Sequence, residues 1–207
     1  MVVDSTEYKR RTMKAYNTLA GELAEKYNHY FETCARLEAD HFLARLNKGD
    51  TILDLGCGVG SASRYFAEQG YTSVGADLSE EMVKECKRRG SASLVRLDLE
   101  VLPFLYSSFD GIWAHTSLLH IPKRRLANAI EGLEKILKPG GALFIALREG
   151  EEEGYEGQLG VERWFAYFQA DEFESHIPSA YRIVRCSRTE RPSVTFLNYH
   201  LVKASER

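Results

Sequence analysis

A strand that runs directly into a glycine-rich turn constrains this chain more than any other feature. The stretch Thr51-Ile-Leu-Asp-Leu-Gly-Cys-Gly-Val-Gly60 places an apolar run before three glycines at alternate positions, Gly56, Gly58 and Gly60, and a helical pattern follows at once. Glycine tolerates positive φ and carries no Cβ, so a ligand can lie against bare backbone at such a turn. The amides that open the next helix would then point at the ligand. The stretch predicts a nucleotide-binding strand-turn-helix unit.

Two details separate this stretch from a dinucleotide-binding turn. A dinucleotide fold places its third glycine three positions after the second, and this chain has Ser61 there. Asp54 lies inside the strand end, where a carboxylate would repel a diphosphate but suits a cationic group such as the ammonium of an amino acid. A nicotinamide-dependent oxidoreductase is therefore the weaker interpretation.

The stretch resembles motif I of the class I S-adenosylmethionine-dependent methyltransferases, of the small-molecule type. Phe109-Asp-Gly-Ile112 and Leu137-Lys-Pro-Gly-Gly-Ala-Leu143 are also typical of that family. The resemblance covers roughly residues 10–202 and weakens past residue 148. It implies an α/β fold with a Rossmann-like, doubly wound, seven-stranded sheet in the order 3-2-1-4-5-7-6. It also implies S-adenosyl-L-methionine as cofactor, S-adenosyl-L-homocysteine as product, and methyl transfer to an O, N or C atom of a small molecule.

The pattern of apolar residues divides one methyltransferase domain, residues 1–207, into three parts. Apolar residues at three- and four-residue spacing predict an N-terminal helical cap over 1–47. Alternating strands and helices predict a cofactor-binding core over 48–148, and 149–207 is expected to hold a substrate-side loop and a C-terminal hairpin. The glutamate-rich stretch 148–156 predicts a mobile, exposed loop. That loop could act as a lid, as an acidic rim that favours a cationic acceptor, or only as a solvated connection.

A carboxylate at the end of the second strand is the next candidate for cofactor binding. Asp77 lies there, 17 residues after Gly60, where it can accept hydrogen bonds from both ribose hydroxyls. Its alternative role is to cap the following helix, although Ser79 is the better cap. The resemblance adds a wider set of cofactor contacts, with Asp98 on the adenine amine, Leu78 and Met82 beside the adenine, and two tyrosines in a segment that closes over the cofactor: Tyr16, Tyr27, Asp54, Gly56, Cys57, Gly58, Gly60, Leu78, Met82, Asp98, Leu99, Ala114 and His115.

Two histidines after the fourth strand are the candidates for proton transfer. Ligands of open α/β sheets lie beyond the carboxyl ends of the strands, so His115 and His120 are expected to face the site, and a histidine can act as a base near neutral pH. Each could instead only wall the pocket or hold the loop. Methyl transfer needs a base only for a poorly acidic hydroxyl or a protonated amine, since in-line positioning supplies much of the rate. Candidate acceptor contacts are Arg148, Trp164 and Tyr167.

Composition and short motifs limit the kinds of partner and cellular setting that are expected for this chain. A formal charge of −3 does not favour a nucleic-acid surface, and no Asn/Asp-Pro-Pro-Tyr/Phe tetrapeptide or Pro-Cys pair points to base methylation. No apolar run reaches the ~20 residues that span a bilayer, and the beginning of the sequence lacks signal-peptide order. The four cysteines are too far apart for a zinc knuckle, so no metal and a cytoplasmic setting are expected. A cofactor-binding regulator without turnover, or one that needs a partner, remains the rival; the oligomeric state is open.

Overall fold

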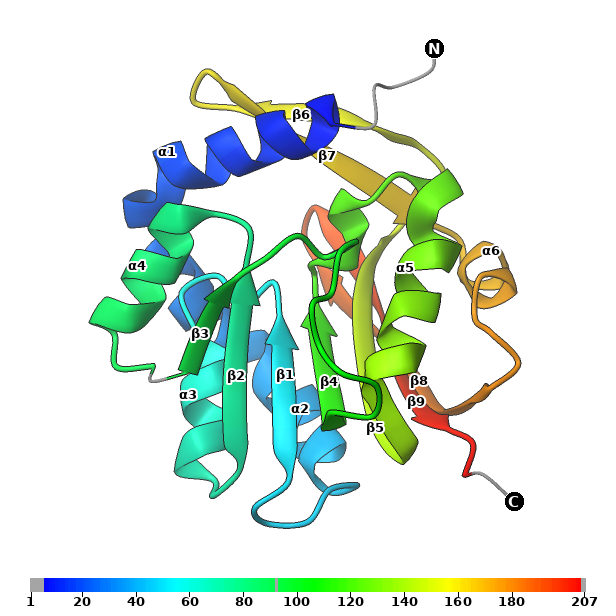
Figure 1. Cartoon of the computed structure of the whole chain (residues 1–207). Coiled ribbons are helices and arrows are strands. Elements are labelled where there is room, and N and C mark those ends of the chain that lie inside the picture. The colour runs from blue at the N-terminus through cyan, green and yellow to red at the C-terminus, as the bar shows by residue number, and fades with distance from the viewer. Residues whose placement is uncertain (1–5, 92, 206–207) are drawn as a thin grey trace.

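The computed structural model describes residues 6–91 and 93–205, and these form one sheet system of nine strands (Figure 1). Its centre is parallel, in the order β3-β2-β1-β4-β5. The strands are β1 Thr51–Leu55, β2 Thr72–Asp77, β3 Ser93–Arg96, β4 Phe109–His115, β5 Leu137–Glu149, β6 Glu153–Gln158, β7 Val161–Phe168, β8 Tyr181–Arg191 and β9 Val194–Lys203.

The C-terminal hairpin completes the sheet as the sequence predicts. Strand β9 runs antiparallel to β5 on one side and to β8 on the other. The order β3-β2-β1-β4-β5-β9-β8 therefore reproduces the expected order 3-2-1-4-5-7-6, with β8 and β9 as its sixth and seventh strands. The predicted Rossmann-like, doubly wound fold is confirmed.

The hairpin β6–β7 was not expected. Residues 148–156 were predicted to form a mobile loop, but β5 continues to Glu149 and Glu153–Gln158 pairs antiparallel with β7. The end of β5 then pairs in parallel with β7, at Arg148–Tyr167 and Glu149–Phe168. The glutamates are compatible with a strand because the ribbon they join leaves them at the surface, where charged side chains stay hydrated. Only residues 150–152 connect the strands, so the prediction of a loop over the whole stretch is wrong, and the sheet has nine strands instead of seven.

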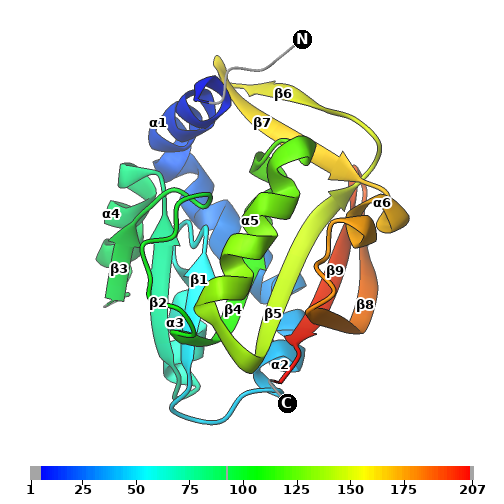
Figure 2. The ribbon, with the colours of Figure 1, turned by 45° about the vertical axis from the view of Figure 1, so that its right-hand side comes forward.

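Helices cover both faces of the sheet and its carboxyl edge. They are α1 Glu7–Tyr30, the π-helical turn η1 Phe31–Ala35, α2 Arg36–Leu43, α3 Ser61–Glu68, α4 Glu80–Arg88, the 3-10 turn η2 Leu118–His120, α5 Lys123–Ile136 and α6 Ala170–Ser175. Helix α1 lies across the carboxyl ends of the central strands, beside the β6–β7 hairpin (Figures 1 and 2). Among the described residues, no helix combines the length and apolar character needed to cross a membrane.

Alternation along the central strands builds two cores. Leu53 and Leu55 pack in the cluster that includes the buried side of α5, whereas Ile52 packs in the cluster that includes α2 and α3. Trp113 and Phe144, from neighbouring strands, stack in this second cluster with ring centroids 4.0 Å apart. Burial of both faces explains why these strands read as nearly continuous apolar runs.

Local signals set several element ends. Ser79 caps α4 as predicted, because its Oγ accepts a hydrogen bond from the amide of Met82 at 3.2 Å. Residues 138–141 are part of β5, whose register against β4 shifts at this point. Gly140 has a φ of 78° there, which only glycine adopts readily.

Candidate functional site

A cavity of about 640 Å³ opens at the carboxyl ends of β1 to β4, below α1 and β7. This volume is in the range of small-molecule sites. The cavity brings together most of the residues that the sequence singles out, from both the cofactor and the histidine sets. Those that line it are Tyr16, Tyr27, Asp54, Gly56, Cys57, Gly58, Asp77, Leu78, Met82, Asp98, Leu99, His115, His120 and Arg148.

Four expected site residues lie outside the lining, namely Gly60, Ala114, Trp164 and Tyr167. Ala114 is fully buried in the core below the site. The ring of Trp164 packs between Tyr8 and Tyr155 instead of facing the cavity. Tyr167 reaches the site only through its hydroxyl, which accepts a hydrogen bond from Arg148 Nη1 at 2.9 Å.

The amides of the glycine turn are used within the protein. Those of Gly56 and Cys57 both donate to the carbonyl of Ala76, at 2.7 and 2.9 Å. That of Gly58 donates to Asp77 Oδ2 at 2.9 Å. The turn is thereby fixed to the end of β2 by three amides that lie before α3.

The glycines of the turn serve different purposes. A Cβ on Gly58, where φ is 52°, would lie 3.8 Å from the ring of Tyr27, so the missing side chain keeps the space between turn and α1 open. A Cβ on Gly60, where φ is 75°, would lie 2.2 Å from Cys86 Sγ. Gly58 therefore fits a ligand cradle, whereas Gly60 allows α4 to pack against the turn.

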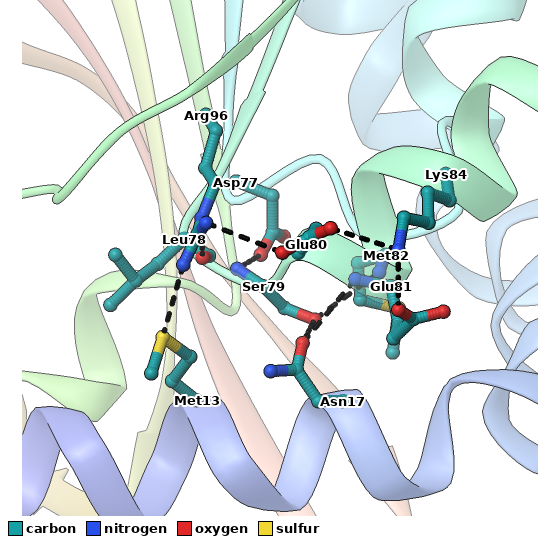
Figure 3. Close-up of polar contacts among 10 residues, drawn as sticks. All are labelled: Met13, Asn17, Asp77, Leu78, Ser79, Glu80, Glu81, Met82, Lys84 and Arg96. Carbon is teal, nitrogen blue, oxygen red and sulfur yellow. Dashed lines mark hydrogen bonds and ion pairs between the residues drawn. The ribbon is translucent and has the colours of Figure 1, made fainter.

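Asp77 lies in the cavity and joins the turn to α4. Its second oxygen, Oδ1, accepts a hydrogen bond from the amide of Ser79 at 2.8 Å (Figure 3). Burial raises the pKa of Asp77, and the bound amides of Ser79 and Gly58 oppose that rise. Ser79 Oγ also donates to Asn17 Oδ1 at 2.7 Å, which ties α1 to the beginning of α4.

Asp54 is the most enclosed carboxylate of the cavity, with 3% of its surface exposed. Ser63 Oγ donates a hydrogen bond to its Oδ2 at 2.5 Å. Burial raises the pKa of Asp54 to about 7; the Ser63 hydrogen bonds oppose the rise and the charge of Asp77 adds to it. A neighbouring cation would favour the ionised form, so this side chain suits the ammonium role that its position predicts.

Asp98, the third carboxylate assigned to the cofactor, forms an ion pair with a lysine that the sequence analysis did not single out. Lys9, on α1, lies 2.6 Å from both Asp98 Oδ2 and Glu100 Oε2. Glu100 also accepts hydrogen bonds from the hydroxyl of Tyr8 and from Arg125 Nε. This cluster fastens the first turns of α1 to the loop after β3, so any ligand of Asp98 would share it with Lys9.

His115 ends β4 at the middle of the cavity. Its ring stacks on Trp113, at 5.6 Å between centroids, and tilts against Tyr30 at the same distance. Burial lowers the pKa of His115 to about 4. The ring is therefore neutral near pH 7 and a weak base, which disfavours the predicted role in proton transfer.

His120 connects α1 with β7. Its Nδ1 lies 2.6 Å from the carbonyl oxygen of Trp164 and its Nε2 lies 2.7 Å from the hydroxyl of Tyr16. A carbonyl only accepts, so Nδ1 carries the proton and Tyr16 donates to Nε2. Burial lowers the pKa of His120 to about 3, and the positive charges of nearby arginines contribute to the decrease. Like His115, it is a weak base.

The end of the cavity beyond β4 is assembled from residues that sequence reasoning missed. It is lined by aromatic and cationic side chains, Tyr30, Phe165, Phe196, Arg163 and Arg191, together with the expected Arg148. They come from α1, β5, β7, β8 and β9, and no local motif joins them. The sequence pointed to this region only through Arg148 and through Trp164 and Tyr167, which share β7 with the lining residues Arg163 and Phe165.

The part of the chain that matches a known protein family lies within the cofactor-binding core expected over 48–148. A family model described as a methyltransferase domain matches residues 53–145. Malonyl-(acyl-carrier protein) O-methyltransferase of Enterobacter lignolyticus is 33% identical over 126 residues, 59% of this chain and 49% of that protein. Phosphoethanolamine N-methyltransferase 1 of Zea mays is 28% identical over 152 residues, 70% of this chain and 29% of that protein. The chain thus spans about half the length of the malonyl-type relatives.

A solved structure matches nearly the whole chain. It is the 1,6-didemethyltoxoflavin-N1-methyltransferase of Burkholderia thailandensis, with 1,6-didemethyltoxoflavin and S-adenosylhomocysteine bound. The TM-score is 0.81 at 20% identity, over 99% of this chain and 92% of that one. At this identity the match establishes a shared fold.

Proposed function

We propose that this chain is a class I S-adenosylmethionine-dependent methyltransferase, an enzyme that transfers a methyl group to an O, N or C atom of a small molecule. The observation that carries the proposal is one continuous cavity with two unlike ends. One end holds the glycine turn and the carboxylates at or just beyond the carboxyl ends of β1, β2 and β3, and the other is walled by β5, β7, β8 and β9. A cofactor and an acceptor can therefore lie side by side.

The carboxylates at the first end suit the polar groups of S-adenosylmethionine. We assign Asp77 to the ribose hydroxyls, since it already stands as a half-buried acceptor beside the turn. Asp54 would accept the ammonium group, and Asp98 the adenine amine. Leu78, Met82 and Leu99 would line the adenine, and Gly58 leaves room for the cofactor against the turn.

Helix α1 would close over the bound cofactor. Tyr16 and Tyr27 line the cavity from this helix, and Tyr27 accepts a hydrogen bond from Arg163 Nη1 at 3.3 Å. Thr12 Oγ1 accepts one from the amide of Trp164 at 2.9 Å, which holds α1 against β7. Helix and hairpin together would exclude water from the reacting groups, the role expected of the N-terminal segment.

Positioning is the main contribution of the protein to the chemistry. S-adenosylmethionine supplies an electrophilic methyl group and a good thioether leaving group. Holding the acceptor in line with that group replaces a bimolecular encounter by a reaction between fixed partners. Neither His115 nor His120 is a strong base in this environment, so the residues of the chain act by orienting the reactants and keeping the site dry.

Calorimetric titration with S-adenosylhomocysteine and, separately, with NAD tests the cofactor assignment. We expect binding of S-adenosylhomocysteine in the micromolar range and no binding of NAD. NAD binding alone would overturn the proposal in favour of an oxidoreductase. Binding of neither would contradict the assignment for the isolated chain and favour the partner-dependent regulator.

A further inference from the structure

The charges that line the cavity are separated along the edge of the sheet. The carboxylates lie at or just beyond the carboxyl ends of β1, β2 and β3: Asp54, Asp77, Asp98 and Glu100. Beyond β4 no carboxylate lines the cavity in the described part of the chain, whereas β5, β7 and β8 contribute Arg148, Arg163 and Arg191. Two lysines of α1 line the cavity. Lys9 is paired with two of the carboxylates, and the second is Lys26.

We propose, on the basis of the methyl transfer proposed above, that the acceptor is a planar organic acid. Its carboxylate binds Arg148 at the end of the cavity beyond β4 and receives the methyl group on oxygen. Arg148 is the specificity-determining residue, and Arg191 of β8 adds positive charge around the same end.

The hydrogen bonds of Arg148 leave one edge of its guanidinium available. Nη1 contacts Glu156 Oε2 at 3.2 Å and donates to the hydroxyl of Tyr167 at 2.9 Å. Within the described residues, Nε and Nη2 have no hydrogen-bond partner, and Nε is buried. A planar guanidinium edge matches the two oxygens of a carboxylate, and a buried donor without an acceptor is costly. A carboxylate on this edge would satisfy both groups.

The one carboxylate that contacts Arg148 lies outside the cavity. Glu156 belongs to β6, its side chain is 43% exposed, and it is absent from the lining. Glu151, Glu152 and Glu153 are exposed and also absent from the lining. The expected acidic rim for a cationic acceptor is therefore not present at the cavity wall, and the charge that an acceptor meets there is positive.

Aromatic side chains around Arg148 suit a flat acceptor. Its guanidinium carbon lies 4.1 Å from the ring centroid of Phe165. Tyr30 lies 5.8 Å from Phe196, ring to ring. Burial raises the pKa of the Tyr30 hydroxyl, and the nearby charges of Arg191 and Arg148 oppose that rise. His115 packs on the other side of Tyr30. A planar, conjugated acid would contact rings on its faces while its charge is held at the arginine.

If the acceptor is a carboxylate, methyl transfer needs no general base. A carboxylate oxygen forms the new carbon–oxygen bond as the methyl–sulfur bond breaks, and the bonding electron pair goes to sulfur. The negative charge of the acceptor and the positive charge of the sulfonium are both consumed, giving an ester and a thioether. No proton has to be removed, which agrees with the weak basicity of His115 and His120.

Binding to the protein loaded with S-adenosylhomocysteine tests this inference. The probes are benzoate, cinnamate and 2-naphthoate, each compared by calorimetry with its neutral carboxamide. We expect at least one acid to bind about tenfold more tightly than its amide, the size of a single charge-assisted hydrogen-bonded pair. Arg148→Met should abolish this preference. Arg188→Met is the matched control, because Arg188 is an exposed arginine of β8 that pairs with Glu149 away from the cavity.

The outcomes separate this inference from the proposed function. Equal binding of acids and amides by the wild-type protein, or a preference that survives in Arg148→Met, would overturn it. So would a loss of S-adenosylhomocysteine affinity in Arg148→Met, since the arginine would then serve the carboxylate of the cofactor. Normal S-adenosylhomocysteine binding with no acid preference leaves the proposed function intact. Failure of S-adenosylhomocysteine to bind overturns the proposed function, and this inference with it.

Discussion

The two ends of the cavity are built in different ways. We call the end at β1, β2 and β3 the cofactor end and the end beyond β4 the acceptor end, after the roles proposed for them. The cofactor end takes its polar groups from three short segments, 54–58, 77–82 and 98–100, each at or just beyond the carboxyl end of a parallel strand. The acceptor end joins α1 to β5, β7 and the β8–β9 hairpin, which are far apart along the chain. The topology of the sheet therefore positions the first end, whereas the second depends on how the hairpins and α1 pack over it.

The charged groups at the two ends respond differently to burial. It raises the pKa values of Asp54 and Asp77 and lowers those of His115 and His120, in each case against the charged form. Arginine stays protonated in proteins, so burial does not remove the charge of Arg148. The comparison teaches that the cofactor end can adjust its charge to a ligand, whereas the acceptor end presents permanent positive charge.

Loss of the Asp77 charge should give the largest effect on cofactor binding. Asp77→Asn keeps an oxygen for one of the amides of Gly58 and Ser79 but weakens hydrogen bonds to a ribose. We expect the affinity for S-adenosylhomocysteine to fall by ~1–3 kcal/mol, measured by calorimetry. Asp171→Asn, an exposed aspartate at the beginning of α6, should bind normally. An unchanged affinity in folded Asp77→Asn would break the assignment of the cofactor end.

The glycines of the turn should separate stability from binding. Gly60→Ala forces a Cβ against Cys86 Sγ at 2.2 Å, so we expect the free energy of unfolding to fall by ~1–3 kcal/mol. Gly58→Ala meets nothing closer than 3.8 Å and should cost only ~1 kcal/mol for its left-handed backbone, but should weaken S-adenosylhomocysteine binding. Denaturant unfolding and calorimetry distinguish the two. Equal losses of stability would contradict the different roles.

Asp54 should make cofactor affinity depend on pH near neutrality. Its pKa is about 7 and the ammonium group binds the ionised form, so affinity should fall about tenfold per pH unit below pH 7 and level off above it. The sign for stability is opposite: because the folded-state pKa exceeds the ordinary value, stability should decrease as the pH rises from about 4 to about 7. Asp54→Asn should flatten both profiles, and an unchanged wild-type affinity from pH 6 to pH 8 would refute the ammonium role.

Removing the hydrogen bond between Tyr16 and His120 should give the smallest effect, a small loss of stability. Tyr16→Phe removes the hydrogen bond to His120 Nε2 at 2.7 Å and leaves that nitrogen without its donor. We expect a loss of ~0.5–1.5 kcal/mol in the free energy of unfolding, measured by denaturant titration. Tyr106→Phe is the control, because Tyr106 is 77% exposed and should show no change. A loss in both variants would mean that the hydroxyl at Tyr16 has no special role.

The sequence allowed the cofactor end to be predicted because its information is local. A glycine turn after a buried strand and a carboxylate after the next strand are short-range patterns, and parallel strands bring such ends together. The same logic placed Asp54, Gly58, Asp77 and Asp98 in one cavity. It failed for Gly60, whose backbone conformation resembles that of a ligand-binding glycine while its missing side chain makes room for Cys86.

The acceptor end could not be predicted in the same way. Five glutamates in 148–156 favoured a loop, because composition does not reveal that Glu153–Gln158 pairs with β7. Tyr30 and Arg191 carry no motif, and they meet in space only through the packing of α1 and the β8–β9 hairpin. Lys9 was missed for the same reason, since its partners Asp98 and Glu100 lie about 90 residues further along the chain.

A crystal structure of the protein with S-adenosylhomocysteine would test the division of the cavity most directly. The account predicts the ribose hydroxyls on Asp77 and the ammonium group beside Asp54, with the guanidinium of Arg148 free of contact with the ligand. A ligand whose own carboxylate is bound to Arg148 would contradict it, because the positive end would then belong to the cofactor and not to the acceptor.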